Sequence, residues 1–183
     1  MNTALRFSLI ASALTLGAGS LVAASNPMVG GAAMYPTKNI VENAVNSKDH
    51  TTLVAAVKAA GLVDTLASKG PFTVFAPTNA AFAKLPAGTV DTLLKPENKG
   101  TLTAVLTYHV VAGKVSAAQL AAKVKAGGGT ATLTTVQGGT LSFAKHGKGY
   151  TVTDAKGNAA NITIADVNQS NGVIHVIDGV LLP

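Results

Sequence analysis

The chain has 183 residues, no cysteine and no tryptophan, and its 14 basic against 8 acidic residues give a net charge of +6. Without cysteine it forms no disulfide and no cysteine-ligated metal centre, so a packed hydrophobic core must hold it together. The lysines are scattered, and Arg6 is the only arginine, which argues against nucleic acid as a partner. The basic excess favours solubility and some affinity for polyanions.

Residues 1–24 have the layout of a secretory signal peptide. Arg6 gives a positive start, an apolar stretch runs from Phe7 to about Leu16, and small residues lead to Ala24, after which we expect cleavage. The apolar stretch is shorter than the roughly 20 residues that span a bilayer, so no stable membrane insertion is expected. The sequence therefore predicts a secreted or periplasmic protein.

The first part of the exported chain is expected to be mostly helical. Residues 25–38 are rich in glycine, proline and alanine without periodicity, which predicts a flexible lead on the surface. From Asn39 apolar residues recur at helical spacing until Gly70-Pro71 breaks the pattern. Phe72 to Ala76 is an apolar and β-branched run, typical of a buried strand, and Thr78 or Asn79 is then expected to begin a short helix.

The second part changes from helix to strand. Helical spacing continues from Pro96 to His109, and Ser116–Gln119 matches a capping box before a helix that ends at Gly127–Gly129. Short runs rich in Thr, Val and Ile follow, separated by glycine-containing turns: Thr130–Val136, Thr140–Ala144, Tyr150–Thr153, Asn161–Val167 and Val173–Leu182. This pattern predicts antiparallel hairpins and one α+β domain over residues 39–183, in which the early strand joins the later sheet.

Three segments resemble the signature blocks of the fasciclin domain family. They are TVFAPTNAAF at Thr73–Phe82, the pair Tyr108-His109, and NGVIHVIDGVLLP at Asn171–Pro183. Their order and separation make the resemblance specific, and it extends over about residues 39–183, most similar to the single-domain bacterial secreted type. The resemblance implies a β-sandwich or wedge with helices packed against it, in which the first and third blocks lie on neighbouring strands.

The blocks also name the residues expected to build the structural motif. These are Phe75, Pro77, Asn79, Asn171, Gly172, Ile174, His175, Val176 and Asp178. Asn171-Gly172 suits a tight turn, and Asp178 is expected to accept hydrogen bonds from nearby backbone. His175 alternates with Ile174 and Val176, so it either faces solvent or is a hydrogen-bonded core residue.

The resemblance implies adhesion to a cell-surface or matrix protein, or to an acidic polysaccharide. In some animal members binding has been ascribed to a short motif just before the third block and to the Tyr-His pair. Asp166, Val167, Tyr108 and His109 occupy these positions here and are the candidate binding residues. Weak homo-oligomerisation would add avidity to such a single-domain adhesin.

Catalytic and metal chemistry find less support in the residues. A packing role for Tyr108 and His109 is favoured over an acid–base pair, and no serine lies in a Gly-x-Ser-x-Gly turn. No closely spaced metal ligands occur, so we expect no enzyme activity, no cofactor and no metal. Two alternatives stay open: a small-ligand or metal site near Tyr108, His109 and His175, and a glycan hydrolase with Asp166 as its acid.

Overall fold

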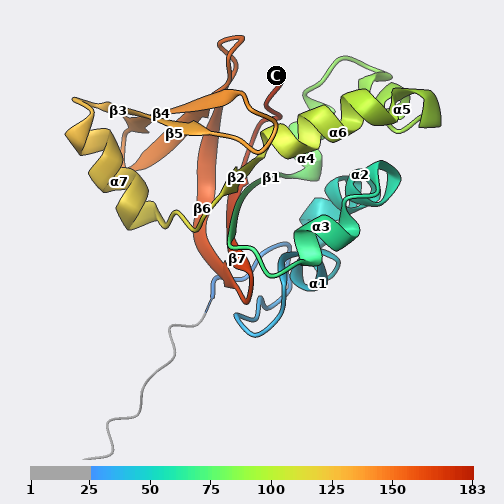
Figure 1. Cartoon of the computed structure of the whole chain (residues 1–183), viewed down its shortest axis with the longest axis horizontal. Coiled ribbons are helices and arrows are strands. Elements are labelled where there is room, and N and C mark those ends of the chain that lie inside the picture. The colour runs from blue at the N-terminus through green and yellow to red at the C-terminus, as the bar shows by residue number, and fades with distance from the viewer. Residues whose placement is uncertain (1–25) are drawn as a thin grey trace, which may run out of the picture.

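A computed structural model describes residues 26–183, which form one curved sheet with helices on both faces (Figure 1). The strands are β1 (Phe72–Pro77), β2 (Val110–Ala112), β3 (Thr130–Thr134), β4 (Thr140–His146), β5 (Gly149–Thr153), β6 (Ala159–Gln169) and β7 (Gly172–Ile177). The helices are α1 (Ile40–Ala44), α2 (Thr51–Ala60), α3 (Val63–Ala67), α4 (Asn79–Ala83), α5 (Thr89–Leu93), α6 (Lys99–Tyr108) and α7 (Ala117–Ala126), with 3-10 turns at Lys48–His50 and Pro96–Asn98.

The strands are ordered β2-β1-β7-β6-β5-β4-β3 across the sheet. β1 pairs in parallel with β7, Val74 lying opposite Ile174, whereas the other neighbouring strands pair antiparallel. The two edges of the sheet approach each other, because the N–H of Val136 beyond β3 donates to the carbonyl of Val110 in β2 at 2.8 Å. The prediction that the first and third blocks lie on neighbouring strands is confirmed.

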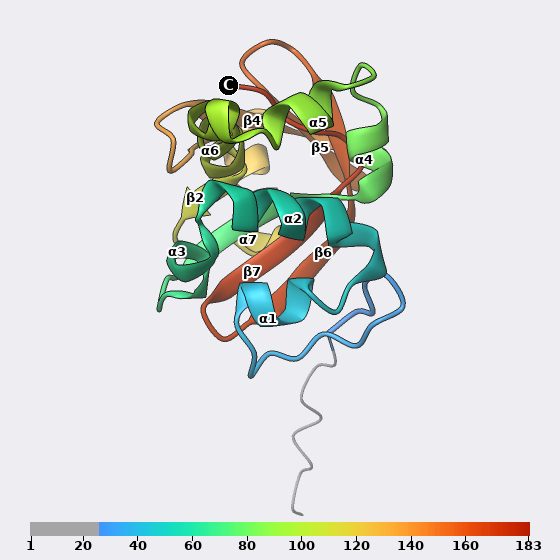
Figure 2. The ribbon, with the colours of Figure 1, turned by 90° about the vertical axis from the view of Figure 1, so that its right-hand side faces the viewer.

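The pair β1–β7 is buried on both faces because the sheet separates two hydrophobic clusters. Val74 and Ile174 belong to the first cluster, which contains buried side chains of α1, α2, α3 and α6. Figure 2 shows α1 and α2 lying in front of β6 and β7. Phe75 and Ile177 belong to the second cluster, with Leu120 of α7 and side chains of β3, β4 and β5. Burial on both faces explains why the two strands are apolar at most of their positions.

Local signals place several helix ends where the sequence predicts them. Ser116 forms a capping box before α7. Its side chain accepts from the N–H of Gln119, and the Gln119 side chain accepts from the N–H of Ser116. α2 ends at Gly61, which has the left-handed backbone conformation that glycine adopts without strain. Thr78, rather than Asn79, caps α4. Asn79 instead accepts from the N–H of Thr52 at 3.0 Å, which connects α4 to α2.

Residues 26–38 are packed against the domain and correct the prediction of a flexible surface lead. Val29 and Met34 are buried in the first cluster. Asn26 exchanges two hydrogen bonds with the backbone of Asn168, at 2.6 and 3.0 Å. A glycine-rich segment without periodicity can still bury single apolar side chains, which a pattern-based prediction misses. The expected signal peptide, residues 1–24, lies outside the described residues. Between residues 26 and 183, no helix has the length and apolar character needed to cross a membrane.

Candidate functional site

Asn171 in the turn between β6 and β7 is a buried side chain that connects three segments. Its Oδ1 accepts from the N–H of Ile40 at 3.0 Å. Its Nδ2 donates to the carbonyls of Leu66 and Ser68, each at 2.7 Å. The predicted turn is therefore also the point where the beginning of α1 and the end of α3 are attached to the sheet.

Gly172 follows in the sequence and allows a close approach between strands. A Cβ at this position would overlap the backbone of Phe72, its pairing partner in β1. Any other residue would therefore push β1 and β7 apart at the start of their parallel ladder. The Asn-Gly pair of the third block thus has a structural role at both positions.

Tyr108 is the last residue of α6, and its side chain is fully buried in the second cluster. Its hydroxyl donates to the carbonyl of Thr140 at 2.7 Å and accepts from the N–H of Ala155 at 2.9 Å. Burial raises the pKa of Tyr108, so the phenol stays protonated at neutral pH. The phenol connects α6 to β4 and to the turn after β5.

His109 is buried beside Tyr108 but contacts different segments. Its Nε2 accepts from the N–H of Leu181 at 3.0 Å, so the proton lies on Nδ1, which donates to the carbonyl of Val105 at 2.8 Å. Burial lowers the pKa of His109 from 6.5 to about 4. The neutral imidazole therefore attaches the C-terminal segment to α6.

His175 in β7 is a hydrogen-bonded core residue, which decides between the two orientations that alternation allowed. Its Nδ1 accepts from the N–H of Asp166 at 3.3 Å, and its Nε2 donates to the carbonyl of Val115 at 2.8 Å. The ring stacks on Phe75 with 5.6 Å between centroids. Burial lowers the pKa of His175, which keeps this imidazole neutral as well.

Asp166 lies where β6 departs from regular pairing. The register between β6 and β7 shifts between Ile164 and Val167, and Asp166 has a positive φ of 56°. Its Oδ1 accepts from the N–H of Ala117, the first residue of α7, at 2.7 Å. A carboxylate at a helix N-terminus is favourable because the first N–H groups have no partner within the helix. The half-buried Asp166 therefore holds the beginning of α7.

Three of the four candidate binding residues are thus interior, which corrects the sequence-based assignment. Tyr108, His109 and Val167 are at most 2% exposed, so a partner of the folded domain does not reach them. Asp166 is partly exposed, but one of its carboxylate oxygens is engaged by α7. The sequence identifies these residues as part of a motif but wrongly assigns the three of them to binding, because their burial depends on partners far along the chain.

The cavity next to His109 does not fit the small-ligand alternative. It lies between the first-cluster helices and the β1–β7 pair, its lining is almost entirely apolar, and its volume is about 40 Å³. Ligand pockets usually have volumes of about 300–1,000 Å³. Tyr108 and His175 do not line it. Within the part of the chain that the structure describes, no three His, Asp or Glu side chains gather into a group that could hold a metal ion.

The comparison with known families agrees with this geometry. Residues 48–183 match the family model described as Fasciclin domain. The chain belongs to the fasciclin domain family. Protein sll1483 of Synechocystis sp. is 53% identical over 157 residues, which cover 85% of this chain and 79% of that protein. Immunogenic protein MPB70 of Mycobacterium bovis is 41% identical over 145 residues, 76% of this chain and 66% of that protein.

One further match is a cell-surface protein, and another is a solved structure with a similar fold. Cell surface glycolipoprotein MPB83 of Mycobacterium bovis is 34% identical over 168 residues, 91% of this chain and 66% of that protein. The solved FAS1 domain pair of the insect cell adhesion molecule fasciclin I superposes with a TM-score of 0.70 at 20% identity, over 80% of this chain. The match spans 51% of that chain, about half of the pair. The predicted fasciclin-like α+β fold is confirmed.

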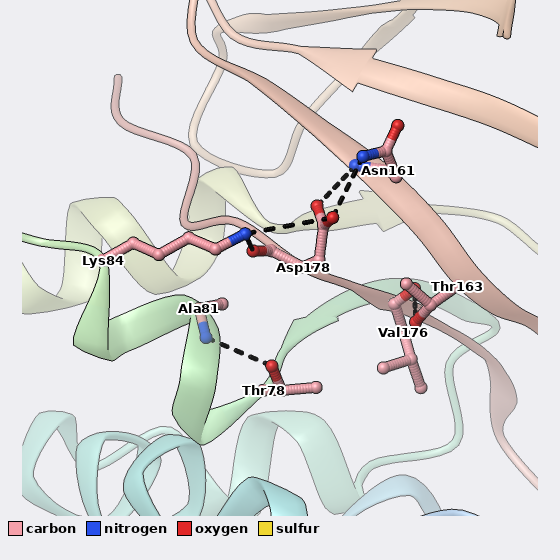
Figure 3. Close-up of polar contacts among 7 residues, drawn as sticks. All are labelled: Thr78, Ala81, Lys84, Asn161, Thr163, Val176 and Asp178. Carbon is pink, nitrogen blue, oxygen red and sulfur yellow. Dashed lines mark hydrogen bonds and ion pairs between the residues drawn. The ribbon is translucent and has the colours of Figure 1, made fainter.

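Asp178 of this fasciclin domain connects β7 to β6 and α4 (Figure 3). Its Oδ1 accepts from the N–H of Asn161 at 2.7 Å and its Oδ2 from the Asn161 side chain at 3.0 Å. Lys84 donates to the Asp178 carbonyl at 2.6 Å, and its Nζ lies 3.9 Å from Oδ2. Burial alone would raise the pKa of Asp178, but the Asn161 hydrogen bonds and the Lys84 charge outweigh it and lower the pKa. The expected backbone hydrogen bond is confirmed.

Sequence reasoning missed one surface feature of the fasciclin domain, which we call the α7 groove. It has a volume of about 500 Å³ and lies between α7 and the β4–β5 hairpin. Its lining includes Ala121, Ala122, Lys125, Gly129, Lys145 and Tyr150. A signal exists in the sequence, since residues 110–160 contain six lysines and a single acidic residue, Asp154. Only the fold shows which of those lysines line the same groove.

Proposed function

We propose that this fasciclin domain is an exported, non-catalytic module that attaches cells to surfaces, matrix or polysaccharide. The observation that carries the proposal is the family match over residues 48–183, together with relatives that are named as cell-surface and cell-adhesion proteins. The signal-peptide pattern of residues 1–24 agrees with it, because an adhesion module must leave the cytoplasm.

The bonding of the motif side chains supports a role without catalysis. Tyr108, His109 and His175 each have their polar atoms hydrogen-bonded to backbone groups within the domain. An acid, base or nucleophile must present its reacting atom to a substrate. These three side chains instead join segments of the fold, so their presence in the three blocks has a structural explanation.

Comparison of source cells with and without the gene tests the proposal. We expect cells that lack it to form less biofilm and to attach less to abiotic and cell-coated surfaces, and the intact gene to restore attachment. A gene that carries Asn171→Asp is the matched control. Its carboxylate would face the carbonyls of Leu66 and Ser68, so this variant should not fold and should not restore attachment. Unchanged attachment, with no retention of the purified domain on envelope material, would contradict the proposal.

Export is tested separately. The exported chain should begin at Ser25 and appear in the medium or periplasm, as determined by mass spectrometry of its N-terminal peptide. A protein that stays in the cytoplasm with Met1 intact would exclude the adhesion role, whatever the fold.

A further inference from the structure

We propose that the α7 groove binds acidic polysaccharide of the uronate type. This inference rests on the proposed function as a surface-interaction module, and it names the site and the chemistry of its ligand. It assigns recognition to Lys125, Lys145 and Tyr150, none of which belongs to the three family blocks.

The shape of the groove follows from the way α7 packs. Leu120 and Val124 place α7 against the second cluster, on the side of the sheet away from α2, α3, α5 and α6 (Figure 1). Ala121 and Ala122 are too small to fill the space between α7 and the β4–β5 hairpin, which leaves the groove open to solvent. Its volume of about 500 Å³ lies within the range of about 300–1,000 Å³ that is usual for ligand sites.

The charged side chains that line the groove are both lysines, Lys125 and Lys145. Asp154, the single acidic residue between positions 110 and 160, is 6% exposed, and its carboxylate accepts hydrogen bonds from Lys156, Asn158 and Leu182. Within residues 26–183, the lysine–carboxylate ion pair of the structure joins Lys84 to Asp178 and does not involve the groove. The exposed ammonium groups of the groove are therefore available to an external anion, which they attract by charge complementarity.

Tyr150 favours a sugar over other polyanions. It is the cross-strand partner of Lys145, so its ring and the Lys145 side chain lie on the same face of the hairpin. The ring is half-buried against the second cluster, and its remaining surface lines the groove. An aromatic face packs against the C–H face of a pyranose, while lysine supplies a point charge for its carboxylate. Nucleic acid fits less well, since the described chain offers no guanidinium fork for phosphate.

Binding of the exported chain to alginate, a linear polyuronate, tests the groove. Lys125→Glu combined with Lys145→Glu should weaken binding by about tenfold or more, and the affinity of the wild type should fall with added salt. The matched control is Lys69→Glu with Lys95→Glu, which makes the same change in net charge at two exposed lysines among the helices. The control pair should change affinity by less than about twofold. An equal loss of affinity in both double variants would overturn the proposed site, because it would show that alginate responds to the overall charge of the domain.

Tyr150 separates sugar binding from binding to any anion. Tyr150→Phe keeps the ring and should bind alginate as the wild type does, whereas Tyr150→Ala should weaken binding by about tenfold. Thermal unfolding of each variant identifies any loss of fold, and only folded variants are compared. Polyglutamate carries carboxylates without sugar rings, so equal affinity for it, with the same dependence on Tyr150, would overturn the polysaccharide assignment.

The groove and the broader adhesion role fail in different ways. If the domain is retained on cell-envelope material but the groove variants bind alginate as the wild type does, the groove is refuted and the adhesion role stands. If cells without the gene attach normally and the purified domain is not retained on cell-envelope material, the adhesion role is refuted, whatever the result with alginate.

Discussion

Acidification should destabilise the domain mainly through His109. Protonation of Nε2 would place a charge in the core and oppose the N–H of Leu181, which now donates to this atom. Burial lowers the pKa of His109 from 6.5 to about 4, so the unfolded chain takes up the proton first as the pH falls. The free energy of unfolding is thus unaffected by His109 above pH 6.5 and falls between pH 6.5 and 4. The loss is about 3 kcal/mol in total and about 2 kcal/mol at pH 5.

Urea unfolding of the wild type and His109→Gln at pH 8 and pH 5 measures this effect. Glutamine offers an acceptor for the N–H of Leu181 but does not titrate, so the variant should be less stable at pH 8 and lose about 2 kcal/mol less on acidification. The pKa values of His50 and His175 are also lowered by burial, and their effects cancel in the comparison. Parallel pH profiles for the two proteins, or a His109 ring that titrates near 6.5 in the folded state by NMR, would refute the reasoning.

Three substitutions test the bonding of the core. Asn171→Ala leaves the buried N–H of Ile40 and the carbonyls of Leu66 and Ser68 without their partner and should lower the free energy of unfolding by about 3 kcal/mol in urea; a loss below about 1 kcal/mol would contradict this bonding. Gly172→Ala should cost about 2 kcal/mol and speed amide exchange along β1–β7, because its Cβ meets the backbone of Phe72; unchanged exchange would show that the strands adjust freely. Phe143→Ala removes a fully buried ring whose centroid lies 5.1 Å from that of the Phe75 ring in β1. It should lower the free energy of unfolding by about 4 kcal/mol in thermal unfolding; a much smaller loss would show that the cavity collapses.

The centre of the fold is predictable from the sequence because its two strands carry a strong pattern. Apart from Thr73 and His175, Phe72–Ala76 and Val173–Ile177 are apolar on consecutive residues, a pattern typical of strands covered on both faces. The capping box at Ser116 is equally readable, since both of its partners lie within three residues. Such signals depend on neighbouring residues only, so they can be recognised in a single sequence.

The role of the motif side chains is not predictable in the same way, because their partners are distant. The hydroxyl of Tyr108 reaches Thr140, and the imidazole of His109 reaches Leu181, 72 positions further along the chain. No periodicity reports such a contact. Burial of Met34 in the lead depends likewise on helices that form later in the sequence. A polar residue in a recurring motif therefore looks functional from the sequence when its role is to close the fold.

The family blocks and the α7 groove are connected through the segment that precedes α7. Thr73 of the first block accepts from the N–H of Val115 at 2.8 Å, His175 of the third block donates to the Val115 carbonyl, and Asp166 accepts from the N–H of Ala117. These bonds fix where α7 begins, and its 10 residues extend about 15 Å to the end that carries Lys125. The motif thus positions the helix that carries Lys125. Residues of the family blocks thus support the groove without lining it.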